Sequence, residues 1–138
     1  MIAFVIYGEP QGKGRPKFTM TGHAYTPERT KTYEAEIVAS FRREFPDFVR
    51  WEKGVPLRVR IKAVYGIPKS DSGLMAARKA SGEIRPTKKP DADNVEKIVL
   101  DAINGIAWKD DAQVVDLRTV KVYGAVPRVE VEIDEIRY

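Results

Sequence analysis

The sequence has no cysteine and a single histidine, His23, among its 138 residues. Without cysteine the chain can form neither a disulfide scaffold nor a thiolate zinc site, and it has no cysteine nucleophile. One histidine argues against a histidine-rich metal site, and no partner for His23 is evident from the sequence. Any catalysis must therefore fall to carboxylates, lysines or hydroxyl groups.

Long hydrophobic runs are absent too. The apolar start, Met1–Tyr7, is too short to cross a bilayer and lacks the basic segment and cleavage site of an export signal. We interpret it as a buried strand and expect a cytoplasmic protein with no membrane partner. The chain is 43% hydrophobic and 32% charged, which fits one globular domain spanning residues 1–138.

Charge is distributed unevenly along the chain. Residues 1–90 contain 18 lysines and arginines against 9 acids, whereas residues 91–138 contain 6 against 11. This layout suits a polyanionic substrate, since cations bind phosphates and clustered carboxylates hold metal ions. Uneven charge is also common in cytoplasmic proteins, so charge alone leaves nucleic acid binding open.

The hydrophobic pattern predicts an α/β fold with a small mixed sheet and two main helices. Thr26 is placed to cap a first helix that has Pro27 in its first turn and ends near Phe45. A second helix is predicted over residues 94–104, with Gly105 at its C-terminal cap. Alternating and β-branched residues predict strands over residues 1–7, 57–65, 113–123 and 129–133, and a long basic excursion over 68–90 that includes a short helix at 74–80.

The first candidate for a chemical role is the pair Asp91 and Asp93. Two aspartates separated by one residue in an extended segment point the same way, because side chains alternate along such a segment. They could then share a hard cation. The structural alternative is that Asp93 caps the second helix and Asp91 belongs to a turn.

Asp110 and Asp111 form the second candidate. Adjacent carboxylates in a turn are ordinarily just solvated. A helix of about eleven residues followed by a return loop can nevertheless bring both ends of the unit together. Four carboxylates could then converge, which requires compensating cation charge. Mg²⁺ fits such a set, with Mn²⁺ as a substitute, because both prefer oxygen ligands.

Lys97 follows Asp93 by four residues and so projects from the same side of the helix. It could form a helix-stabilising ion pair with Asp93. Alternatively, its ammonium group could face the scissile phosphate, where negative charge develops in the transition state. Asp101 lies one turn further on. We expect it to orient Lys97 rather than to bind metal.

Two basic groups are candidates for phosphate binding. Lys13, Arg15 and Lys17 lie in a glycine-rich loop, where glycines allow backbone N–H groups to approach phosphates. The loop lacks the spacing of a P-loop, so no nucleotide cofactor is expected. Lys88 and Lys89 directly precede the first acid motif. Solvated surface lysines are the ordinary alternative for both groups.

Other charged and aromatic side chains are expected to be structural. The basic face of the strand at 57–65 should pair across the sheet with the acidic face of the last strand, that is Arg58, Arg60 and Lys62 with Glu130, Glu132 and Asp134. The aromatic residues Phe18, Tyr25 and Trp108 could stack on exposed bases. We expect at least two of those three to pack in the core.

The acid pairs, Lys97 and the residues around them, taken in their order along the chain, resemble the RusA family of Holliday junction resolvases. The resemblance is carried by Lys88-Lys89-Pro90-Asp91-Ala92-Asp93-Asn94, then by Lys97, by Asp101-Ala102-Ile103-Asn104-Gly105 and by Trp108-Lys109-Asp110-Asp111-Ala112-Gln113-Val114-Val115, with the glycine-rich loop also similar. One departure is Ala92, where the family often has leucine. The resemblance implies a RusA-like fold and a magnesium-dependent, homodimeric endonuclease of the kind often carried by phages and prophages.

The resemblance also implies roles for individual residues. Asp91, Asp93 and Asp111 would bind metal and act in catalysis, Asp110 would belong to the same cluster, and Lys97 would have an essential catalytic role. The expected reaction is hydrolysis of phosphodiesters at four-way DNA junctions in recombination and repair, with paired cuts from a two-fold dimer. Two alternatives stay open: a protein that binds branched DNA without cutting it, and a nuclease for flaps or other branched DNA.

Overall fold

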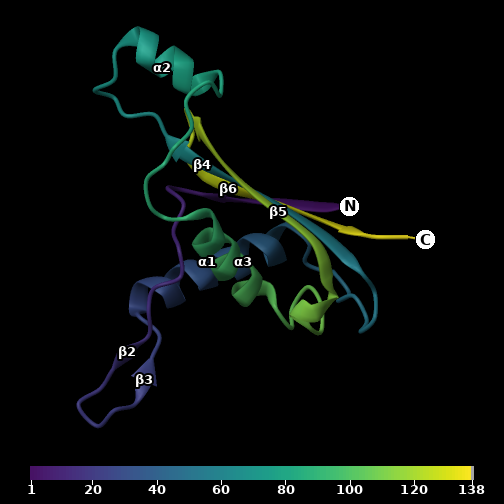
Figure 1. The fold of residues 1–138 in the computed structure, drawn as a ribbon. Coiled ribbons are helices and arrows are strands. Elements are labelled where there is room, and N and C mark those ends of the chain that lie inside the picture. Colours follow the sequence, from purple (N-terminus) through teal and green to yellow (C-terminus); the bar gives the residue numbers. More distant parts are fainter. Residues whose placement is uncertain (138) are drawn as a thin grey trace.

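A four-stranded mixed sheet forms the centre of the molecule (Figure 1). The computed structural model describes residues 1–137. The strand order is β1 (Ile2–Tyr7), β6 (Arg128–Glu135), β4 (Leu57–Gly66) and β5 (Val114–Gly124). β4 runs parallel to β5 and antiparallel to β6, and β6 runs antiparallel to β1. The predicted α/β class with a mixed sheet is confirmed.

Two helices, α1 (Glu28–Glu44) and α3 (Ala92–Ile103), cover one face of this sheet (Figure 1). Tyr33, Ile37 and Phe41 of α1 are buried, and the apolar side of α3 faces the same core. The core therefore lies between the two helices and the alternating apolar residues of β4, β6 and β1, as the amphipathic pattern requires. None of the helices among residues 1–137 is long and apolar enough to cross a membrane.

Several element boundaries differ from the predictions. The N-cap of α1 is Pro27 in an extended conformation, so Thr26 is not the cap. α3 begins at Ala92, two residues earlier than predicted, with Asp91 as its N-cap. β1 is an edge strand with a single neighbour in the sheet, and it is buried only on the face that packs against the core. A short hairpin of β2 (Lys17–Phe18) and β3 (Ala24–Tyr25) was not predicted.

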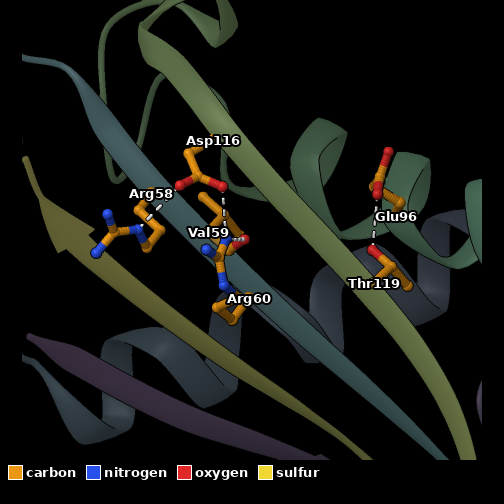
Figure 2. Close-up of polar contacts among 6 residues, drawn as sticks. All are labelled: Arg58, Val59, Arg60, Glu96, Asp116 and Thr119. Atoms are coloured by element: carbon orange, nitrogen blue, oxygen red, sulfur yellow. Dashed lines mark hydrogen bonds and ion pairs between the residues drawn. The ribbon is translucent and has the colours of Figure 1, made fainter.

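The other face of the sheet carries charged residues. Arg58, Arg60 and Lys62 lie opposite the three acids of β6 in the strand register, as predicted. The ion pairs of the two arginines, however, go to Asp116 on β5, at 3.1 Å from Arg58 and 2.9 Å from Arg60 (Figure 2). These side chains are partly exposed, so the pairs contribute little to stability.

Two further contacts fix the position of the helices. The Thr119 hydroxyl of β5 donates to the Glu96 carboxylate of α3 over 2.7 Å, which ties α3 to the edge strand (Figure 2). The predicted short helix in the basic excursion is present as α2 (Gly73–Ala80), which lies beyond the end of the sheet (Figure 1). Lys79 of α2 pairs with Asp71 over 2.7 Å.

Candidate active site

The two acid pairs lie at opposite ends of α3. Asp91 and Asp93 are at its N-terminus, and Asp110 and Asp111 are at the short 3-10 helix η1 (Asp111–Gln113) that follows its C-terminus (Figure 1). Twelve helical residues span about 18 Å. Within residues 1–137 no three His, Cys, Asp or Glu side chains lie close enough together to hold one metal ion. The expected convergence of four carboxylates does not occur in a single chain.

The first pair also differs in local geometry from the prediction. Asp93 lies in the first turn of α3 and not in an extended segment. Side chains two residues apart on a helix do not face each other, so the prediction that both point the same way for that reason is wrong. Asp91 holds the cap position, but its side chain makes no capping hydrogen bond. Both residues are exposed, which leaves their carboxylate oxygens open to a ligand.

The second pair is held in place by its surroundings. The Asp110 carboxylate accepts a hydrogen bond from the backbone N–H of Ala112 over 3.0 Å. The side chain of Gln113 accepts from the backbone N–H groups of Lys109 and Asp110, which completes a capping box. Gln113 is buried and donates to the backbone carbonyl of Glu52. The loop after α3 is therefore rigid.

Asp111 occupies a partly desolvated position. Its carboxylate accepts a 2.8 Å hydrogen bond from the indole N–H of Trp108, a fully buried residue. Burial raises the pKa of the Asp111 carboxyl, and the negative charges of Asp101 and Asp110 raise it further, although the Trp108 hydrogen bond opposes them. A nearby cation would relieve both the desolvation and the repulsion. Asp111 is thus an electrostatically favourable position for a metal ligand.

Lys97 is exposed on the outer face of α3. Among residues 1–137 it forms no ion pair with Asp93, so the predicted structural alternative is absent. Asp101 pairs instead with Lys13 over 2.9 Å, which contradicts the expectation that it orients Lys97. Lys97 lines a cavity of about 210 Å³ together with Arg15 of the glycine-rich loop. Its ammonium group is available to a bound anion.

A cleft of about 880 Å³ brings the two basic groups together. Its walls are the glycine-rich loop, the start of α1 and the segment that leads into α3. Every cation predicted to bind phosphate lines it, as does Asp91: Lys13, Arg15, Lys17, Lys88 and Lys89. Arg29 is a further cation in this cleft. The sequence did not indicate its role, because an arginine in the first turn of a helix is common and carries no functional signal. The guanidinium of Arg29 donates to Gln11 over 3.2 Å.

The loop reaches this position because two of its glycines pass very close to the helices. A Cβ atom on Gly12 would collide with the side chain of Asn94, and one on Gly14 would lie 2.6 Å from the Thr30 hydroxyl. The backbone N–H of Gly14 donates to that hydroxyl over 2.9 Å. A side chain at either position would force Asn94 or Thr30 to move, so the glycines favour close packing of the loop on α1 and α3.

Lys13 and Tyr65 anchor the cleft from inside. Lys13 pairs with Glu34 over 3.5 Å as well as with Asp101. Burial lowers the pKa of Lys13, but the hydrogen bond to Asp101 and the charges of both acids outweigh it and leave the pKa raised. The Tyr65 hydroxyl donates to the backbone carbonyl of Pro90, and burial together with the charge of Asp91 raises the pKa of Tyr65 to about 12. Lys13 is thus engaged in ion pairs within the fold, whereas the other cations of the cleft form none among residues 1–137.

Comparison with known proteins adds an independent observation. The model of the family described as Endodeoxyribonuclease RusA matches residues 7–134. The chain is also 36% identical over 140 residues to the uncharacterized protein YqaN of Bacillus subtilis (strain 168), an alignment that covers 98% of this chain and 96% of that relative. The family match includes the glycine-rich loop, both acid pairs and the whole of α3.

Proposed function

The chain belongs to the RusA family of endodeoxyribonucleases, and from that premise we propose that it resolves four-way DNA junctions by metal-dependent hydrolysis of phosphodiesters. The observation that carries the proposal is the cleft, because cations from two distant segments line it and a free carboxylate, Asp91, lies in the same wall. Resolution of a junction by two paired cuts would serve DNA recombination and repair.

The cleft is proposed to bind the DNA backbone. Arg15, Lys17, Lys88 and Lys89 would contact phosphates, and Arg29 would add a fifth cation. Such contacts position the DNA without reading its sequence. They also make affinity strongly dependent on salt, because each neutralised phosphate releases a counterion.

The donor set fits a hard divalent cation, Mg²⁺ or Mn²⁺. Mg²⁺ is usually held by one or two carboxylates together with substrate phosphate oxygens and water. Asp91 and Asp93 would supply the carboxylates from the N-terminus of α3. When bound, the metal supplies Lewis-acid chemistry at the scissile phosphate. Lys97, one turn along the helix, would stabilise the negative charge that develops on the phosphate oxygens.

From the separation of the acid pairs we infer that a homodimer completes the centre. In a two-fold dimer with antiparallel α3 helices, Asp91 and Asp93 of one subunit would meet the partner's Asp111, supported by the partner's Asp110. β5 offers a suitable contact, since it is an edge strand beside α3 with Val115 and Leu117 exposed. Such a dimer has two centres, which paired cuts require.

A cleavage assay tests this function. Purified protein is incubated with a labelled four-way junction, a flap and linear duplex, each with Mg²⁺, with Mn²⁺ and with chelator. We expect symmetric cuts in the junction that depend on either metal. Junction binding without cleavage in both metals would refute the nuclease and favour a DNA-binding protein. Faster cleavage of the flap would change the assigned substrate.

A further inference from the structure

The β2–β3 hairpin (residues 17–25) projects from the body of the molecule (Figure 1). It carries exposed apolar side chains. Phe18 is 70% exposed, Tyr25 is 45% exposed and Met20 is fully exposed. The expectation that at least two of Phe18, Tyr25 and Trp108 pack in the core is therefore wrong, because only Trp108 is buried. Large apolar side chains gathered on a protruding element indicate an interaction site.

Hydrogen bonds of the backbone and of the Thr19 hydroxyl hold the hairpin in shape. The N–H of Thr19 donates to the carbonyl of His23 over 2.8 Å, and the N–H of Gly22 donates to the carbonyl of Thr19 over 3.0 Å. Gly22 has a positive φ of 85°, which a turn of this kind requires. An isolated two-stranded hairpin is marginally stable in water. A bound partner would thus order it.

The two sides of the hairpin differ. In the strand register Lys17 lies opposite Tyr25, and Phe18 lies opposite Ala24. Directly opposed residues of an antiparallel pair share a face. One face therefore combines a cation with an aromatic ring, and the other presents the Phe18 ring beside a small residue. Such faces suit a partner that has both charged and flat aromatic groups.

The hairpin continues the wall of the cleft. Lys17, the first residue of the hairpin, and Pro27, two residues after its last, both line the cleft. A chain lying in the cleft would therefore meet the hairpin at its end. Residues 10–27 contain three lysines and arginines and no acid, so the whole segment favours a polyanion over a typical protein surface.

We propose that the β2–β3 hairpin is a second DNA-binding element, in which Phe18 and Tyr25 stack on bases that become exposed where the branch point opens. This inference rests on the proposed function and adds to it, because it names the residues that distinguish branched DNA from duplex. Aromatic side chains stack on any base, whereas paired bases inside a duplex are inaccessible to them. The backbone cations of the cleft bind both forms.

The test measures junction and duplex binding in an Asp93→Asn background, with 2-aminopurine placed at the branch point. Phe18→Ala should weaken junction binding about tenfold and abolish the rise in 2-aminopurine fluorescence. Duplex binding should change less than about twofold, since phosphate contacts remain. Phe18→Trp, which keeps an aromatic surface, should bind the junction within about twofold of the unaltered hairpin. Leu74→Ala, in the exposed part of α2, is the matched control, because Leu74 is 73% exposed.

The outcomes separate this inference from the function itself. Unchanged junction binding and fluorescence in Phe18→Ala would overturn the hairpin proposal while cleavage by the unaltered chain continued to support the nuclease. Equal weakening on junction and duplex would also overturn it. Sedimentation velocity tests whether the hairpin instead contacts a second copy of the chain. If Phe18→Ala converts dimers to monomers, the hairpin is a dimer contact and the proposal is wrong.

Discussion

The two ends of α3 present the same residue type in opposite circumstances. At the N-terminal end Asp91 and Asp93 are exposed and make no capping bond. At the C-terminal end Asp110 accepts a backbone hydrogen bond and Asp111 accepts one from a buried indole. The first pair contributes little to the fold and is free for a ligand. The second pair is positioned by the fold before any ligand arrives.

Because of this difference, substitutions at the two ends of α3 should affect the cleavage rate and the free energy of unfolding to different extents. Removing a carboxylate at the N-terminal end should affect chemistry alone. Removing one at the C-terminal end should affect chemistry and stability together, because its hydrogen bonds belong to the loop as well as to the site. The predictions below test this contrast, in order of decreasing effect.

The largest effect is expected for Asp93→Asn. Loss of a metal-binding carboxylate removes several kcal/mol of charge stabilisation, so single-turnover cleavage of a junction should fall at least about a hundredfold. The free energy of unfolding should change by less than about 0.5 kcal/mol, because the side chain is exposed and unbonded. Junction binding should be retained in a gel-shift assay. Cleavage within about twofold of the unaltered chain would remove Asp93 from the centre.

A smaller effect is expected for Asp110→Ala, measured by urea unfolding. The substitution removes the cap of η1 and should lower the free energy of unfolding by about 1 kcal/mol. Asp110→Asn, which keeps an acceptor, should cost much less. Asp91→Ala is the matched control at the other end of α3, where no side-chain cap exists. Equal losses for the two alanine variants would contradict the contrast between the ends.

The smallest effect concerns pH. The pKa of Asp111 is raised above its ordinary 3.8, chiefly by burial, so the folded chain holds that proton more tightly than the unfolded chain. The free energy of unfolding should therefore decrease as pH rises from the unfolded pKa through the folded one. Asp111→Asn should remove this slope and be slightly more stable than the unaltered chain near neutral pH. A steeper decrease in the variant would contradict the assigned direction.

Periodicity was sufficient to predict the elements that build the core. The helices and long strands have continuous apolar patterns, and these were found within a few residues of their bounds. The start of α3 was placed two residues late because both Asp91 and Asp93 are good caps, and only tertiary contacts decide between them. The β2–β3 hairpin has strands of two residues, which are too short to show any period.

The candidate site was predictable by residue type but not by geometry. Residue type and spacing named the candidate aspartates and lysines, whereas the cleft depends on how closely the loop packs on α1 and α3 at Gly12 and Gly14, which the sequence does not show. The separation of the acid pairs follows from the length of α3. The expectation that a return loop would bring both acid pairs together within one chain was wrong, because no cluster of three such side chains forms among residues 1–137.

The central claim is that the two ends of α3 work together across a dimer, and mixed dimers test it most directly. Asp93→Asn and Asp111→Asn chains are co-expressed with different tags, and each species is assayed for junction cleavage in Mg²⁺. Either variant alone should be inactive. The purified heterodimer has one centre with all its carboxylates, so it should regain about half of the cutting rate of the unaltered dimer. A heterodimer as inactive as either variant would contradict the claim.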